Sequence, residues 1–61
     1  MRILYVNHYG WIVGGTPETG LRFTKHREGA KPFDPYSNEY FDVCYYIENT
    51  LKCNYDRYWK F

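Results

Sequence analysis

The pattern of hydrophobic and polar residues changes between the first half of this chain and its last third. Residues 2–8 are rich in Ile, Leu, Tyr and Val, and residues 21–27 alternate apolar or long side chains with polar ones, and both patterns are typical of β-strands. A further apolar run at residues 11–13 follows Gly10, where the chain can turn. The first half therefore predicts a small antiparallel sheet of two to three strands.

Glycine and proline mark the segments between these runs. Residues 14–20 hold three Gly and one Pro, and we expect them to form a loop. A helix from Thr16 to Gly29 is a weaker interpretation, because it would contain Gly20 and lack an apolar stripe. Residues 28–32 are the next predicted turn.

The last third of the chain has apolar residues at steps of three and four, with polar residues on the opposite side. This spacing predicts an amphipathic helix of about five turns that covers one face of the sheet. Ser37 or Asn38 is expected to cap its first turn. The residues of the apolar stripe are Tyr40, Val43, Cys44, Ile47, Leu51, Tyr55 and Tyr58.

The same segment also fits a hairpin, because Tyr, Phe, Val, Ile and Cys are not strong helix formers. Residues 41–47 would then face residues 51–55 around a turn at 48–50, and the fold would be an all-β small barrel or meander. The helix explains more positions and has a start signal. We therefore predict an α+β fold, with residues 1–61 as a single small domain.

The composition adds a second feature, because aromatic residues outnumber aliphatic ones. There are fourteen Tyr, Phe and Trp residues against nine Val, Ile and Leu residues. A chain of this length buries only about 60% of its unfolded surface, so its core cannot hold every aromatic side chain. Some Tyr and Trp residues are expected at the surface, and these types are enriched at protein interfaces.

Aromatic and charged residues outside the apolar stripe are the candidate contacts to a partner. Residues 58–61 form an aromatic tail that either fastens the helix to the sheet or acts as a contact element. The candidate partner-binding residues are Trp11, Tyr36, Tyr46, Arg57, Trp59 and Lys60.

Charge is unevenly distributed along the chain. Residues 1–32 carry five basic and two acidic side chains, a net charge of +3, whereas residues 33–61 carry three basic and five acidic side chains, a net charge of −2. Such asymmetry orients a protein toward a charged partner. The acidic face of the predicted helix comprises Glu39, Asp42, Asn49 and Asp56, and the basic segment comprises Arg22, Lys25, His26, Arg27 and Lys31.

The basic segment supports binding to single-stranded nucleic acid as an alternative function, since unpaired bases stack on nearby aromatic rings. The overall net charge of +1 argues against it, because nucleic-acid-binding domains are usually far more basic. Binding to a larger protein or protein complex is therefore the favoured class, and a homodimer is a further alternative.

No motif predicts catalysis, a metal or a cofactor. His8, His26, Cys44 and Cys53 lack the short spacing of zinc sites, and nothing in the sequence places a cysteine beside a histidine as a nucleophile pair. The two cysteines are nine positions apart and would lie on opposite faces of a helix. We expect them to be reduced thiols in a cytoplasmic protein that is not an enzyme.

The first residues do not resemble a targeting segment or a membrane span, because the apolar run at 3–6 is too short for either. These features together predict a small protein-binding module with no membrane association. Phages and mobile elements encode inhibitors of this kind, and such an inhibitor would cover a functional site on a host enzyme or defence complex.

Overall fold

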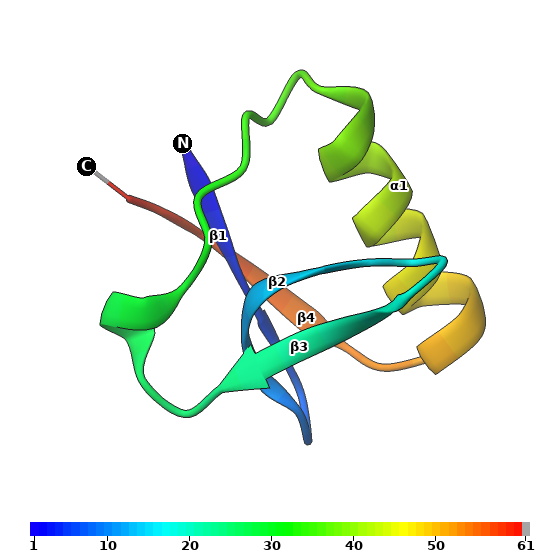
Figure 1. The fold of residues 1–61 in the computed structure, drawn as a ribbon, viewed down its shortest axis with the longest axis horizontal. Coiled ribbons are helices and arrows are strands. Elements are labelled where there is room, and N and C mark those ends of the chain that lie inside the picture. The colour runs from blue at the N-terminus through cyan, green and yellow to red at the C-terminus, as the bar shows by residue number, and fades with distance from the viewer. Residues whose placement is uncertain (61) are drawn as a thin grey trace.

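A computed structural model describes residues 1–60, which form a four-stranded antiparallel sheet with a helix across one face (Figure 1). The spatial order of the strands is β3-β2-β1-β4. The strands are β1 (Arg2–Val6), β2 (Gly10–Thr16), β3 (Gly20–Thr24) and β4 (Tyr55–Trp59), and the helix is α1 (Asn38–Tyr46).

The α+β fold predicted from the sequence is confirmed, but the sheet differs from the prediction in one respect. It has four strands instead of two to three, and the fourth comes from the C-terminal end of the chain. Strand β4 pairs with β1 along its whole length, from Val6↔Tyr55 to Arg2↔Trp59. The all-β barrel with a C-terminal hairpin is wrong, since α1 occupies the segment that would form the hairpin.

Helix α1 begins where the sequence indicated and ends earlier. The Ser37 hydroxyl accepts a hydrogen bond from the Tyr40 N–H at 3.2 Å, so Ser37 is the N-cap. After α1 the chain makes one π-helical turn, η2 (Ile47–Leu51), and reverses at Lys52, whose φ is 55°. The expected helix of about five turns is therefore wrong beyond Leu51, where the helical turns end.

The helix ends early because the C-terminal residues pair with strand β1 instead. Strand β1 would otherwise leave one edge of backbone groups without hydrogen bonds, and β4 pairs with that edge. The aromatic residues Tyr55, Tyr58 and Trp59 also favour a strand over a helix. Tyr55 and Tyr58 consequently lie in the sheet and are not part of a helical stripe.

The glycine-rich segment at residues 14–20 is mostly strand, which corrects the predicted loop. Strand β2 continues through Gly14 and Gly15 to Thr16, and β3 begins at Gly20. Gly15 has a φ of 87°, and a Cβ there would lie 2.2 Å from the carbonyl oxygen of Gly20. Glycine thus permits the close approach of the two strands, and a helix from Thr16 to Gly29 is wrong.

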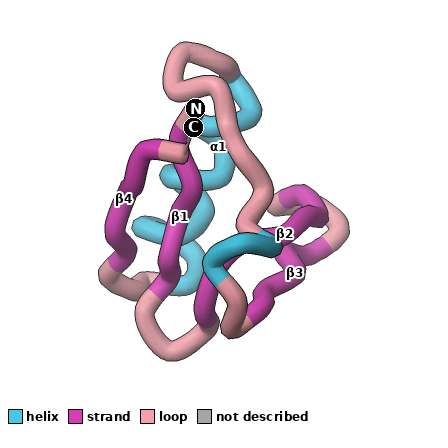
Figure 2. Tube along the Cα trace, turned by 90° about the vertical axis from the view of Figure 1, so that its left-hand side faces the viewer, coloured by secondary structure: helices cyan, strands magenta, loops and turns pink. Residues whose placement is uncertain are grey.

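Strand β3 ends at Thr24, earlier than the predicted strand at 21–27, because a 3-10 turn, η1 (Arg27–Gly29), follows it. This turn and α1 lie on opposite sides of the sheet (Figure 2). The segment after η1 joins the sheet where β1 and β2 stop pairing. The Lys31 N–H donates to the Ile12 carbonyl at 2.8 Å, and Phe33 exchanges two hydrogen bonds with Arg2.

The core lies between α1 and the face of the sheet that it covers. Leu4, Val6 and Ile12 point from the strands toward Val43 and Ile47 of the helical segment, and all five are at most 1% exposed. Phe33, Tyr40 and Cys44 complete this cluster. The aliphatic residues thus build one dry layer, which fixes the position of α1 relative to the β2–β3 hairpin.

Candidate functional site

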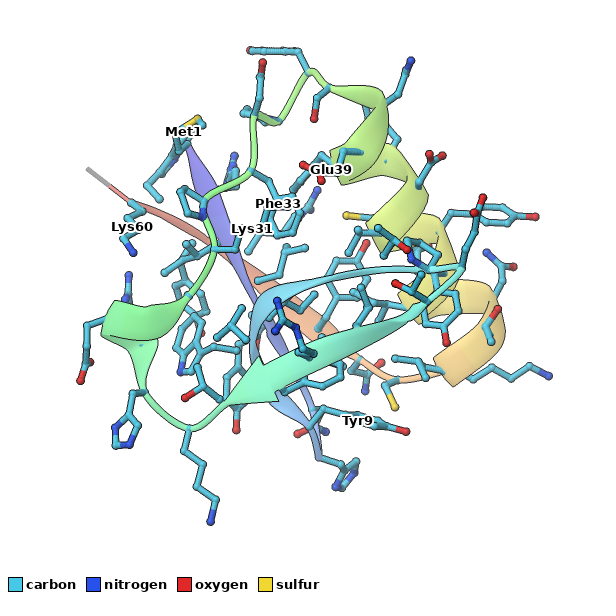
Figure 3. The ribbon with its side chains drawn as sticks, viewed as in Figure 1. Met1, Tyr9, Lys31, Phe33, Glu39 and Lys60 are labelled. Atoms are coloured by element: carbon cyan, nitrogen blue, oxygen red, sulfur yellow. The ribbon has the colours of Figure 1, made fainter. Side chains whose placement is uncertain are left out.

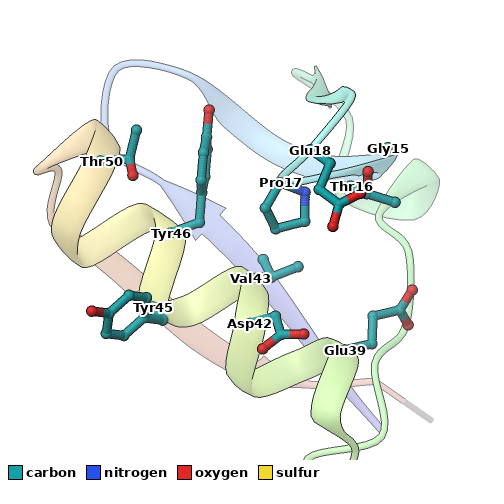
Figure 4. Close-up of a pocket in the computed structure, with 10 residues that line it drawn as sticks. All are labelled: Gly15, Thr16, Pro17, Glu18, Glu39, Asp42, Val43, Tyr45, Tyr46 and Thr50. Carbon is teal, nitrogen blue, oxygen red and sulfur yellow. The ribbon is translucent and has the colours of Figure 1, made fainter.

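A groove of ≈ 650 Å³ separates α1 from the tip of the β2–β3 hairpin (Figure 4). The hairpin contributes one wall, and the outward side of α1 and η2 contributes the other. The lining residues are Gly15, Thr16, Pro17, Glu18, Glu39, Asp42, Val43, Tyr45, Tyr46 and Thr50.

The floor and walls of the groove follow from the helical repeat of α1. Val43 belongs to the buried side of the helix and lies below Pro17 of the hairpin tip (Figure 4). Tyr46 comes three positions later, so it projects from the same side of the helix and stands half-buried between the hairpin and Thr50. Tyr45 is 70% exposed at the rim. The groove thus combines an apolar floor with tyrosine rings.

The hairpin tip is held in shape by hydrogen bonds between its two threonines. The hydroxyl groups of Thr16 and Thr19 are 2.8 Å apart, and the Thr19 N–H donates to the Thr16 hydroxyl at 3.1 Å. These bonds close the turn around Pro17 and Glu18, and the wall of the groove is therefore built before any ligand arrives.

The groove carries negative charge. Glu18 reaches from the hairpin toward the helix, and Glu39 and Asp42 stand on the helical wall (Figure 4). The Lys31 ammonium group donates to the Glu39 carboxylate at 2.8 Å (Figure 3). Among the described residues that line the groove, none is Lys, Arg or His. Two of the three carboxylates are therefore left for a cation from outside.

Of the six predicted partner-binding residues, Tyr46 alone lines this groove. Trp11 lies on the other face of the sheet, where its ring centroid is 5.0 Å from that of Tyr5 and 5.4 Å from that of Tyr58. The Arg27 guanidinium stacks 5.3 Å from Trp11 and 5.0 Å from Tyr58. Trp11 is thus part of a second packed cluster.

The C-terminal candidates lie along β4. Trp59 is 53% exposed, and the Arg2 guanidinium stacks 3.9 Å from its ring. Lys60 is tied to the fold, since its ammonium group donates to the Ala30 carbonyl at 3.0 Å. Arg57 is exposed beside the Tyr40 hydroxyl. The remaining residue of the predicted aromatic tail, Phe61, lies outside the described residues.

Tyr36 is 87% exposed in the turn before α1, so it is as accessible as the sequence predicted. Its N–H donates to the Asp34 carboxylate at 3.0 Å, which orders the backbone and leaves the ring in solvent. Tyr36 does not line the groove between α1 and the hairpin.

The basic residues of the alternative nucleic-acid site are engaged in different places. Arg27 stacks on Trp11 and Tyr58, and Lys31 pairs with Glu39 beside α1. The Arg22 side chain extends from β3 over Gly14 of β2, whereas Lys25 and His26 are exposed in the loop after β3. The sequence segment is basic, but the fold pairs or stacks much of its charge.

A group of titratable side chains is packed between α1 and β4. The Tyr55 hydroxyl donates to the Glu48 carboxylate at 2.6 Å. Burial raises the pKa of Tyr55, and the hydrogen bond to Glu48 raises it further. Burial likewise raises the pKa of Cys44 and of Tyr40. All three groups are consequently neutral at physiological pH.

Both cysteines are free thiols, as predicted. Cys44 is buried, and Cys53 donates from its Sγ to the Leu51 carbonyl at 3.4 Å. His26, the histidine considered as a base, has its Nδ1 3.9 Å from the Glu28 carboxylate. A protonated buried thiol is a poor nucleophile, so Cys44 acts as a core residue.

Within residues 1–60, no group of three or more His, Cys, Asp or Glu side chains is placed to hold a metal ion. None of the helical segments in the same range has the length and apolar character needed to cross a membrane. Comparisons with protein-family models, with curated proteins and with solved structures found no match to this chain.

Sequence reasoning missed the groove as a site, although it identified several of its parts. Tyr46, Glu39 and Asp42 were visible as exposed positions of a helix. The other wall comes from Pro17 and Glu18, in a segment that local composition marks only as a loop. Nothing in the local sequence indicates that these two walls meet.

Proposed function

We propose that the protein is a protein-binding module, and that its groove accepts a cationic segment of a larger partner protein. The observation that carries the proposal is the lining of the groove, which joins three carboxylates to two tyrosines around an apolar floor. A Lys or Arg side chain fits this chemistry, because its aliphatic stem packs on the floor while its charged end reaches the carboxylates.

The tyrosine rings strengthen the case for an extended peptide over a free ion. Tyr45 and Tyr46 offer ring faces on which a guanidinium or ammonium group can stack. Their hydroxyl groups can also donate or accept hydrogen bonds from a peptide backbone. Tyrosine supplies such contacts at a low cost in conformational entropy, so a short basic segment is the occupant that we propose.

Binding is favoured over catalysis because the nucleophilic side chains lie elsewhere. Cys44 faces the interior between α1 and β4, on the side of the helix away from the groove. The groove itself offers surface carboxylates and hydroxyl groups. The role of an inhibitor encoded by a phage or mobile element remains a prediction from length and composition, and it requires a partner enzyme for its test.

The proposal is tested with an array of short peptides of varied composition, probed with the labelled protein. We expect the bound peptides to be enriched in Lys and Arg, and their binding to weaken as salt rises. Asp42→Asn and Glu18→Gln should each weaken binding by about tenfold, which corresponds to about 1.4 kcal/mol. Glu28→Gln is the matched control, because Glu28 is an exposed acid outside the groove.

Tyr46→Phe separates the hydroxyl from the ring, since it keeps the packing against the hairpin. We expect it to weaken binding less than the loss of a carboxylate, because a neutral hydrogen bond contributes about 1 kcal/mol. A thermal midpoint equal to that of the unmodified protein shows that each variant is folded. Peptides without a basic bias, or binding that survives both carboxylate substitutions, would overturn the proposal.

A parallel measurement on single-stranded DNA distinguishes the alternative function. Retention at about 50 mM salt that Arg27→Ala removes, while Asp42→Asn leaves it intact, would favour a nucleic-acid-binding surface around Trp11 and Tyr58. The groove proposal predicts no such retention.

A further inference from the structure

Strand β4 forms one edge of the sheet, and in Figure 2 no described element lies beyond it. It pairs with β1 on one side, from Val6↔Tyr55 to Arg2↔Trp59. An edge strand presents a row of backbone N–H and C=O groups that can pair with another strand. The residues that hold these groups can be identified from the register.

In antiparallel pairs, every second residue directs its backbone groups toward its neighbour. The Lys60 N–H donates to the Met1 carbonyl at 2.9 Å, and the Asn7 N–H donates to the Asn54 carbonyl at 2.9 Å. The even-numbered residues between them therefore face β1. It follows that Tyr55, Arg57 and Trp59 direct their N–H and C=O groups outward, away from the sheet.

We propose that two copies of this chain pair through β4, antiparallel, about a twofold axis that passes by Tyr58. Each Arg57 then exchanges backbone hydrogen bonds with the partner's Trp59, and the two sheets become one continuous sheet. A twofold contact of this kind uses the same patch on both copies. The proposal concerns the opposite edge of the sheet from the groove and does not depend on the function proposed there.

The charges of β4 favour this register over the two neighbouring registers with their axes at Arg57 and at Asp56. An axis at Arg57 places that residue opposite the partner's Arg57, and an axis at Asp56 places that residue opposite the partner's Asp56. Like charges directly opposite each other are destabilising. The axis at Tyr58 instead places Asp56 opposite the partner's Lys60 and Arg57 opposite the partner's Trp59.

Side chains on both faces of β4 are exposed, so they can pack against a second copy of the strand. Trp59 is 53% exposed on the face that α1 covers, and Tyr58 is 38% exposed on the other face. Arg2 already stacks on one side of the Trp59 ring at 3.9 Å. In the proposed register the partner's Arg57 stacks on Trp59 as well, and Tyr58 packs against the partner's Tyr58 across the axis.

Pairing through β4 leaves the groove open. The groove is built by the β2–β3 hairpin and α1, and β3 forms the opposite edge of the sheet from β4. A dimer would therefore carry two grooves. It would bind a partner with repeated basic segments more tightly than a single copy does.

The test is sedimentation equilibrium of the full chain across a concentration series. We expect a reversible monomer–dimer equilibrium. Arg57→Pro should abolish the dimer, because it removes an N–H that points outward without removing a hydrogen bond to β1. Arg57→Ala keeps that N–H and should only weaken the dimer several-fold.

Asp56→Lys is a second variant, and it leaves the backbone unchanged. It places a lysine opposite the partner's Lys60, so the dissociation constant should rise several-fold. Asp56 is exposed, so the variant should fold, and its thermal midpoint at low concentration checks this. A monomer at every concentration overturns the proposal, as does a dimer that neither Arg57→Pro nor Asp56→Lys weakens.

Discussion

The two faces of the sheet are built from different side chains. Under α1, Leu4, Val6 and Ile12 are completely buried. On the other face, the half-buried rings of Tyr5 and Trp11 contact each other, and the Arg27 guanidinium stacks on Trp11. Because neighbouring residues of a strand point to opposite faces, one short strand serves both layers, and β1 holds Leu4 and Tyr5 side by side.

This difference shows how a chain with few aliphatic residues packs side chains on both faces of its sheet. The helix completes an aliphatic core on one face, and such a core is stabilised by removing apolar area from water. The other face also buries Ile3, which is 1% exposed, but its helical cover among the described residues is the three-residue turn η1. Rings stacked edge to face, with a guanidinium over them, give a layer that tolerates partial exposure.

The largest expected effect is on the face covered by α1. Leu4→Ala should lower the free energy of unfolding by about 2–5 kcal/mol, since it leaves a cavity in a fully buried site. Urea unfolding followed by circular dichroism measures the change. Leu21→Ala, at a partly buried position that packs against the same core, should cost less. Equal losses at both positions would contradict the contrast between core and periphery.

An intermediate effect is expected on the other face. Trp11→Ala removes the ring that contacts Tyr5 and Tyr58 and should cost about 2 kcal/mol. Trp11→Phe should recover part of this loss. A double-mutant cycle with Arg27→Ala should give a coupling of about 0.5–1 kcal/mol. A coupling of zero would mean that Arg27 only lies near the rings.

Alkaline pH should loosen the contact between α1 and β4. The folded state raises the pKa values of Cys44, Tyr40 and Tyr55 above those of the unfolded chain. Each group therefore stabilises the fold fully below its unfolded pKa, which is about 9 for cysteine and about 10 for tyrosine. The free energy of unfolding should fall as pH rises past these values.

Urea unfolding at a series of pH values between 8 and 11 measures this slope. Tyr55→Phe should make the slope shallower, because it removes one titrating hydroxyl. Tyr36→Phe is the matched control, since Tyr36 is 87% exposed and should leave the slope unchanged. A slope that Tyr55→Phe does not alter would assign the alkaline sensitivity to another part of the molecule.

The smallest effect is expected at Trp59. In dilute solution Trp59→Ala should lower the free energy of unfolding by less than about 1 kcal/mol, because the ring is 53% exposed and, among residues 1–60, its one stacking partner is Arg2. The comparison with Trp11→Ala in the same assay is the useful measurement. If Trp59→Ala unfolds the protein, the residue belongs to the core, and its place in the proposed contact between copies is wrong.

The local sequence was sufficient to predict those elements whose sequence signals lie within a few neighbouring residues. A cap at Ser37 or Asn38 follows from residue type, and the inward positions Tyr40, Val43, Cys44 and Ile47 follow from helical spacing. Strand β1 follows from a run of residues that favour strands. These signals act over a few residues, so they can be seen without the rest of the chain.

The tertiary structure decided the remainder. Residues 55–59 fit a helical stripe, and only the open edge of β1 makes them a strand. Gly14 and Gly15 indicate a loop by composition, and only the close approach of β3 makes them part of a hairpin. The groove depends on both of these structures. The β2–β3 hairpin forms one wall, and the helical segment, which ends at Leu51, forms the other.

The sequence by itself determined the fold class, the start of the helix and the supply of exposed tyrosine and tryptophan. Which of these rings are free, and which carboxylates face one another, was decided by strand pairing between distant residues. The physical reason is that backbone hydrogen bonds and packed contacts form between residues that are far apart in the sequence. Local residue preferences do not show which of these distant residues will meet. Glu18 and Asp42 became one site only when the hairpin reached α1.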